Sequence, residues 1–110
     1  MLAGIFGNAS SEKVLLYLEH FGEGYATRIA NNFDGLSLHM AQRQLERFER
    51  AGALVSSLTG RTRVYTWNPR YPFRVELRAL LAKALKALPA AERKRAFSER
   101  RRPRRAGKPR

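Results

Sequence analysis

The sequence of 110 residues contains no cysteine and no long apolar run. Without cysteine the chain forms neither disulfides nor thiolate metal sites, which suits a reducing compartment, and we expect a cytoplasmic protein. No apolar stretch approaches the roughly 18 residues that a membrane span needs. Residues 1–6 also lack the basic segment and long apolar stretch of a secretory signal. We therefore expect neither a membrane partner nor export.

The residue patterns of catalytic and metal sites are missing as well. There is no Ser/His/Asp spacing, no phosphate-cradling glycine loop and no carboxylate pair in an apolar setting. The sequence has only two histidines, and His39 has no cluster of partner ligands, so neither a metal site nor a cofactor is expected. Glu46 and Glu49 lie on one side of an expected helix. Arg47 and Arg50 lie among them, which indicates surface ion pairs of little energetic weight. We expect that the chain is not an enzyme.

Positive charge, by contrast, is present in excess. Lysine and arginine total 22 against 9 acidic residues, which gives a net charge of +13. Residues 89–110 alone hold ten basic and two acidic residues, or +8, and residues 1–88 carry the other +5. Such an excess indicates a polyanionic partner, with nucleic acid as the first choice. We expect one domain at residues 1–88 and a basic, largely disordered tail at residues 89–110, in which residues 90–97 could form a short helix.

Three segments with helical spacing of apolar residues come first in the chain. The first helix, which Ser10 or Ser11 can cap, ends at the glycines of residues 22–24. A short second helix is expected at residues 25–33. The third begins at the N-cap Ser37 and closes with a glycine.

A β-hairpin is expected next. Two strand-like runs at residues 54–58 and 63–68 are joined by a loop at residues 59–62. Tyr65 and Trp67 lie two residues apart and so share one face of the second strand. We expect them in a core or an interface, and not as stacking platforms for single-stranded nucleic acid.

Residues 36–52 combine a capping Ser37, a polar stretch with Arg43, a leucine at position 45 and a closing Ala51-Gly52 before an apolar strand. This pattern resembles the recognition helix of winged-helix repressors of the ArsR type. The loop at residues 60–65 is similar to their wing, and residues 25–30 take the place of their positioning helix. The resemblance covers roughly residues 10–88. Metal-sensing members carry Cys or His/Asp ligand sets that this chain lacks, so metal sensing is not expected.

The resemblance implies an α+β winged helix-turn-helix of three helices and a two-stranded β-hairpin wing, with an additional C-terminal helix and the basic tail. It also implies sequence-specific binding of double-stranded DNA by a small, nucleoid-associated transcriptional regulator, in most such cases a dimeric repressor. The helix at about residues 37–51 would enter the major groove, with the wing on the backbone or in the minor groove. No residue identifies a small-molecule effector.

Arg43 and Gln42 have the side chains that pair with the edges of guanine and adenine. Basic and polar residues of the second helix and the wing are suited to phosphate contacts. The full set of expected DNA-contacting residues is Thr27, Arg28, Ser37, His39, Met40, Gln42, Arg43, Arg61, Thr62 and Arg63.

An amphipathic helix is expected at about residues 72–88, after the prolines that end the hairpin. One interpretation of its wide apolar stripe is packing on the domain's own core. The other, which the resemblance favours, is an interface between two copies of the chain. The residues expected in this interface are Phe73, Leu77, Leu80, Leu81, Ala84 and Leu88. A two-fold dimer would present two recognition helices about one turn of DNA apart.

Two alternative functions remain open at this point. One is an architectural or RNA-binding protein that depends on the basic tail, since residues 100–110 would bind any nucleic acid through counterion release. The other is a module that binds a protein partner through the long helix at residues 72–88.

Overall fold

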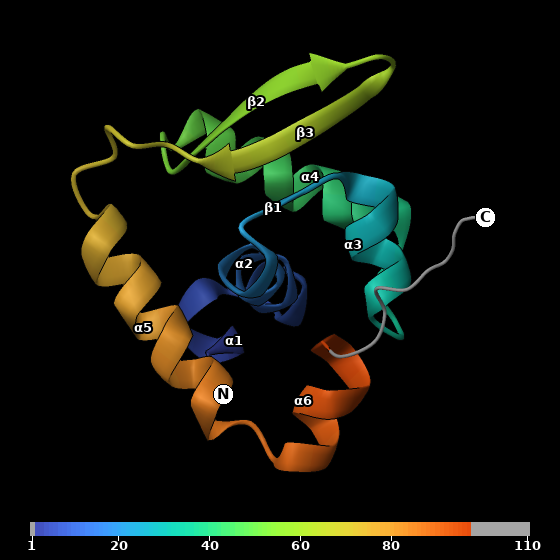
Figure 1. Ribbon diagram of the computed structural model, residues 1–110, viewed down its shortest axis with the longest axis vertical. Coiled ribbons are helices and arrows are strands. Elements are labelled where there is room, and N and C mark those ends of the chain that lie inside the picture. Colours follow the sequence, from blue (N-terminus) through green and yellow to red (C-terminus); the bar gives the residue numbers. More distant parts are fainter. Residues whose placement is uncertain (1, 98–110) are drawn as a thin grey trace.

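The computed structural model describes residues 2–97, which form helices and three short strands (Figure 1). In chain order the elements are α1 (Ala3–Phe6), α2 (Ala9–Phe21), β1 (Glu23–Gly24), α3 (Ala26–Asn32), α4 (Leu38–Arg50), β2 (Leu54–Thr59), β3 (Thr62–Trp67), α5 (Arg74–Ala87) and α6 (Ala90–Phe97). The strands form one antiparallel sheet in the order β1-β3-β2. The chain is therefore α+β, as predicted, and compatible with a winged-helix-like fold. The expected two-stranded hairpin is present as β2 and β3, and β1 adds a third strand that was not expected. The predicted disorder of residues 98–110 lies outside the described residues.

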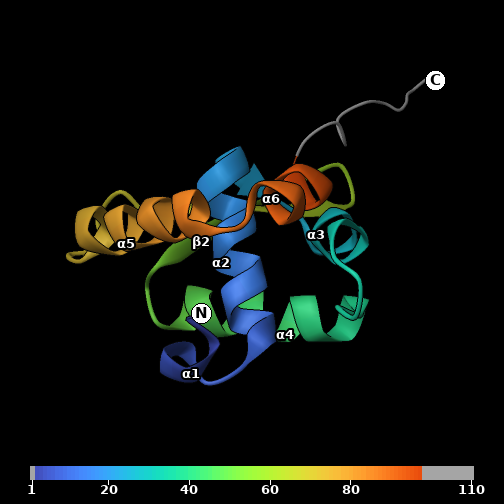
Figure 2. The same ribbon diagram turned by 90° about the horizontal axis from the view of Figure 1, so that it is seen from below.

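Helix α2 runs through the centre of the molecule and is viewed nearly end-on in Figure 1 and from the side in Figure 2. Residues 14–18 are all buried, because α1, α4, α5 and β1 contact the helix on different sides. Its N-cap is Asn8, whose Oδ1 accepts a hydrogen bond from the backbone N–H of Ser11 at 2.7 Å. The expected caps Ser10 and Ser11 are therefore wrong. Both serines lie inside the first turn and are buried.

Strand β1 was not expected, because residues 22–24 were expected only to end the first helix. Gly22 does end α2, with a φ of 86°. The next two residues then pair with β3, Glu23 opposite Thr66 and Gly24 opposite Tyr65. The pairing brings the backbone at Gly24 against α2 and α3, where a Cβ atom would lie 2.7 Å from Cε1 of Tyr17. Glycine is thus the residue that lets this short strand join the sheet.

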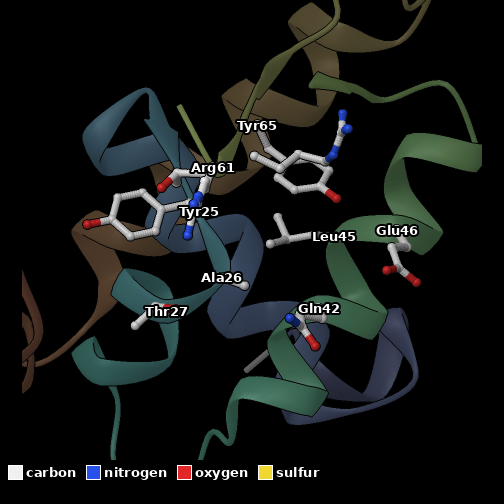
Figure 3. Close-up of a pocket in the computed structure, with 10 residues that line it drawn as sticks. Tyr25, Ala26, Thr27, Gln42, Leu45, Glu46, Arg61 and Tyr65 are labelled. Carbon is white, nitrogen blue, oxygen red and sulfur yellow. The ribbon is translucent and has the colours of Figure 1, made fainter. Parts of the chain in front are cut away.

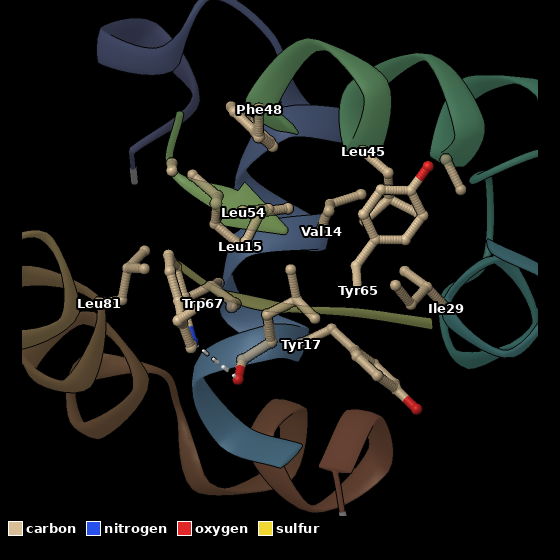
Figure 4. Close-up of a cluster of buried hydrophobic side chains, with 14 of the residues drawn as sticks. Val14, Leu15, Tyr17, Ile29, Leu45, Phe48, Leu54, Tyr65, Trp67 and Leu81 are labelled. Atoms are coloured by element: carbon tan, nitrogen blue, oxygen red, sulfur yellow. Dashed lines mark hydrogen bonds between the residues drawn. The ribbon is translucent and has the colours of Figure 1, made fainter. Parts of the chain in front are cut away.

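The hairpin of β2 and β3 has a shorter connection than expected. Thr59 pairs with Thr62, so the turn is formed by Gly60 and Arg61, with Gly60 at a φ of 66°. Tyr65 and Trp67 lie in the hydrophobic core, as expected (Figure 4). Nε1 of Trp67 donates a hydrogen bond to the carbonyl oxygen of Leu18 at 3.3 Å, which joins β3 to the end of α2.

Helix α5 packs along α2 through Leu81 and Ala84, whose exposed fractions are 0% and 4%. At the same contact Nε of Arg78 donates to Oε1 of Glu19 at 2.8 Å. The helix begins at Arg74 and ends at Ala87, within two residues of the expected bounds. Among the described helices, none combines the length and the apolar composition of a membrane span.

Candidate nucleic-acid interface

Helices α3 and α4 pack against each other and are joined by the turn at residues 33–37. Ser37 is the N-cap of α4, as predicted, and its Oγ accepts a hydrogen bond from the backbone N–H of Met40 at 3.1 Å. Leu36 is buried and anchors the turn in the core. The start of α4 is therefore fixed both by a cap and by an apolar anchor next to it.

One face of α4 enters the core through Ala41, Leu45 and Phe48. The residues between them project outward. Exposed side chains on the first half of the helix include those of His39, Met40, Gln42 and Arg43, together with Leu38. Of the residues expected to contact DNA, those on α4 and its cap are thus all exposed, and none of them belongs to the core.

A polar hollow of about 460 Å³ lies where α3, α4 and the hairpin meet (Figure 3). Its lining consists of Tyr25, Ala26, Thr27, Gln42, Leu45, Glu46, Arg61, Thr62, Arg63 and Tyr65. Half of the ten residues expected to contact DNA line this one hollow, although they come from three separate elements. The others lie elsewhere: Ser37, His39, Met40 and Arg43 are outside the lining, and the guanidinium of Arg28 lies 5.9 Å from the ring centroid of Tyr25.

A chain of hydrogen bonds ties the hairpin to α4 beside this hollow. Nη1 of Arg63 donates to Oγ of Ser56 at 3.0 Å, and this hydroxyl donates to Oε2 of Glu49 at 2.7 Å. The positive charge of Arg63 is therefore partly offset by a carboxylate of α4. Arg61, at the turn of the hairpin, is exposed.

Two carboxylates of α4 also affect the titration of Tyr65. Burial raises the pKa of Tyr65 above its usual value of 10.0, and the charges of Glu49 and Glu46 raise it further, against a smaller opposing effect of Arg63. The phenol is consequently neutral at physiological pH. It can accept or donate a hydrogen bond at the hollow but supplies no charge.

Sequence reasoning missed the second half of α4. Arg47 and Arg50 were expected to form ion pairs with Glu46 and Glu49, but among the described residues no such pair occurs within 4.0 Å. Glu49 turns toward Ser56 instead. Arg47 and Arg50 line a second hollow of about 250 Å³ together with Asn8, Arg43, Gln44 and Glu46. Their spacing from Arg43, four and seven residues, was the available signal.

The residues expected in a dimer interface divide into three groups by exposure. Leu81 and Ala84 are buried against α2, so they cannot contact another copy of the chain while this packing holds. Leu77 and Leu88 are partly buried at the edge of the core. Phe73 and Leu80 remain outside it, with exposed fractions of 62% and 40%.

In the described part of the chain, no group of three or more His, Cys, Asp or Glu side chains could hold a metal ion. No protein-family model matches this chain, and no curated protein or solved structure matches it either.

Proposed function

We propose that the chain is a sequence-specific, double-stranded DNA-binding protein that acts as a dimeric transcriptional regulator of the ArsR-like, winged helix-turn-helix type. In this proposal α3 and α4 form the helix-turn-helix and the β2–β3 hairpin is the wing. One observation carries it. Helix α4 buries one face and exposes a polar one, and the hairpin and α3 add Arg61 and Thr27 to the same side of the molecule (Figure 3).

Helix α4 would enter the major groove with its first two turns. There Gln42 and Arg43 have exposed, flexible side chains that reach base edges, and each can form two hydrogen bonds with one base. His39 and Met40 flank them on the exposed surface. The N-cap Ser37 would lie close to the backbone of one strand, where polar side chains and helix N-termini bind phosphate.

The hairpin would contact the backbone or the minor groove mainly through Arg61. Gly60 and Arg61 form the turn, and the guanidinium of Arg61 is exposed. Arg63 pairs with Leu58 next to the turn, but its guanidinium is held by Ser56, so it would act along the side of the hairpin and not at its tip. Thr27 and Arg28 of α3 would bind the phosphates on the other side of the hollow.

A direct test is in vitro selection of bound duplexes, followed by footprinting on the selected site. We expect one protected, near-palindromic site. The double variant Gln42→Ala, Arg43→Ala should lose the preference for it, because the base contacts are removed. As a matched control, Lys83→Ala removes an exposed cation of α5 and should leave the preference intact. Selection that returns no shared sequence would refute a sequence-specific regulator.

A second candidate is a nucleic-acid-binding protein driven by the tail, which the +8 charge of residues 89–110 favours. Truncation after residue 97 separates the two functions. A regulator keeps its site preference and loses affinity, whereas a tail-driven protein loses nearly all binding to both DNA and RNA.

A further inference from the structure

Three arginines follow one side of α4, away from the hairpin. Arg43, Arg47 and Arg50 are spaced by four and three residues, and all three are exposed. We call these three residues the arginine flank. They line the 250 Å³ hollow beside the first turn of α2, so they form one surface.

Hydrogen-bond donors dominate this hollow. Ser11 is fully buried below it, and its Oγ lies 2.9 Å from both Oδ1 of Asn8 and Oε1 of Gln44. Oδ1 of Asn8 accepts the backbone N–H of Ser11, and Oε1 of Gln44 accepts the one hydroxyl proton of Ser11. The amide nitrogens of Asn8 and Gln44 are therefore the groups left for a ligand. Amide N–H groups and guanidinium groups only donate, and so they fit an anion with several acceptor oxygens.

Arg47 is already held in position within the flank. Its Nη2 lies 3.4 Å from the carbonyl oxygen of Phe6, and its guanidinium carbon lies 4.9 Å from the ring centroid of Phe48. Stacking on an aromatic ring restricts a long side chain while its remaining N–H groups stay free to bind. A contact made by Arg47 would therefore cost less conformational entropy than one made by an unrestrained arginine.

The two long sides of α4 also differ in charge. Toward the hairpin, the lining of the 460 Å³ hollow carries a charge of +1, from Arg61 and Arg63 against Glu46. Glu49 lies beside this hollow, where it binds Ser56, and offsets that charge further. On the other side the three arginines face one carboxylate, that of Glu46 at the rim, so the lining of the smaller hollow carries a charge of +2. A polyanion that approaches α4 is thus attracted to the arginine flank more strongly than to the hairpin side.

From these observations we propose that the arginine flank binds the phosphodiester backbone of double-stranded DNA, with Arg47 and Arg50 as phosphate contacts and with Asn8 and Gln44 as supporting donors. The inference rests on the proposed function, to which it adds the strand contact opposite the hairpin. Helix α4 is then held in the groove from both sides, by the hairpin on one strand and by the arginine flank on the other. Arg43 lies at the end of the flank that would be nearest the bases, so it could contact either a base or a phosphate.

The test is the salt dependence of binding to a random-sequence DNA duplex, measured with the full chain. The slope of log K against log salt is negative, and each lost phosphate contact makes it shallower by about 0.9. Arg50→Gln should therefore reduce the magnitude of the slope by about 0.9, and Arg47→Gln with Arg50→Gln by about 1.8. Arg70→Gln, which removes an exposed arginine between β3 and α5, is the matched control and should leave the slope unchanged. Arg50→Gln keeps the test valid should loss of the Arg47 contacts disturb α1.

An unchanged slope in both flank variants would overturn the inference. A second result would also overturn it. If millimolar inorganic phosphate competes with DNA for the parent chain, and the flank variants lose this competition but keep the DNA slope, the hollow holds a free anion and not the DNA backbone. Because the duplex has a random sequence, the slope does not depend on site preference. A failed selection of a preferred site therefore refutes the proposed regulator, whereas an unchanged slope with a preferred site refutes the flank alone.

Discussion

At Gly24 the backbone of β1 passes so close to α2 and α3 that a side chain has no room. An added Cβ would lie 2.7 Å from Cε1 of Tyr17 and 3.2 Å from Cδ1 of Ile29. The ring of Tyr17 is buried, and its centroid lies 4.5 Å from that of Phe21, so it cannot turn aside freely. We expect Gly24→Ala to lower the free energy of unfolding by about 1–3 kcal/mol, in the range of other overpacked cores.

Urea denaturation followed by the fluorescence of Trp67, the single tryptophan, measures this effect. Gly4→Ala is the matched control, because apart from its chain neighbours and the backbone of α1 no described atom lies within 4 Å of a Cβ at that position. It should leave the stability unchanged or raise it by up to about 1 kcal/mol, since alanine favours a helix. Equal stability of the two variants would contradict the close packing at β1.

Tyr65 couples the stability of the fold to alkaline pH. Burial, then Glu49 and Glu46, raise the pKa of this phenol in the folded chain, while the unfolded chain titrates near 10.0. Above that pH the unfolded state has released the proton and the folded state still holds it. Stability is therefore fully present below pH 10 and falls as the pH rises from there through the folded pKa.

We expect Tyr65→Phe to remove this part of the alkaline loss, measured as the free energy of unfolding on either side of about pH 10. Tyr71→Phe, which changes a tyrosine only partly buried at the edge of the core, is the control and should keep the loss. A loss of the same size in Tyr65→Phe and in the parent chain would assign it to other groups.

At the scale of single elements, the start of α4 depends on one hydroxyl. Oγ of Ser37 satisfies the backbone N–H of Met40 at 3.1 Å, so Ser37→Ala should lower the free energy of unfolding by about 1 kcal/mol. Ser37→Asp keeps the cap and should restore the stability, yet it adds a negative charge where the proposal puts a phosphate. DNA affinity should then fall in Ser37→Asp although the fold is intact.

Two measurements, urea denaturation and a gel shift, separate these effects. Ser57→Ala, an exposed serine of β2, serves as the control and should change the stability by less than about 0.5 kcal/mol. Unchanged DNA affinity in Ser37→Asp would show that the start of α4 lies away from the backbone.

The elements differ in how far the sequence predicts them, and the reason is how local their signals are. Ser37 and Gly52 directly flank α4, so its end signals are local, and both ends were predicted correctly. β1 has two residues, and Glu23 pairs with Thr66, which lies 43 residues further along the chain, so no local pattern marks this strand. The cap of α2 was missed because Asn8 competes with Ser10 and Ser11, and local sequence does not decide among three residues of similar capping strength.

The candidate interface was predicted in part for the same reason. The outward residues of the first turns of α4 follow from its period once the buried face is known. The arginine flank required the spatial structure, because the sequence pairs Arg50 with Glu46 just as well. Glu49 accepts a hydrogen bond from Ser56, and Asn8 lines the same hollow as Arg47. Both arrangements depend on contacts between different elements of the fold.

At the scale of the whole molecule, the proposed DNA-contacting elements and the proposed dimer contact use different parts of the fold. α4 and the hairpin lie on one side of α2, and α5 lies along another (Figure 1). With Leu81 and Ala84 committed to the core, a contact between two copies would depend on Phe73 and Leu80, with the edges of Leu77 and Leu88. The interface would be smaller than the full stripe indicates.

Leu80→Glu tests whether this reduced stripe joins two copies. A charge at a 40% exposed position is tolerated by the monomer, whereas in an interface it would be buried without a partner, so we expect dimers to dissociate. Sedimentation velocity should show the loss of dimer, and affinity for a palindromic site should fall toward that for a half-site. Leu58→Glu, at a 60% exposed position on the hairpin, is the control for sedimentation alone, because a charge on the proposed wing also affects DNA binding, and it should leave the dimer intact. If Leu80→Glu sediments as the parent chain does, two copies do not meet through α5, and the spacing of recognition helices must come from another contact.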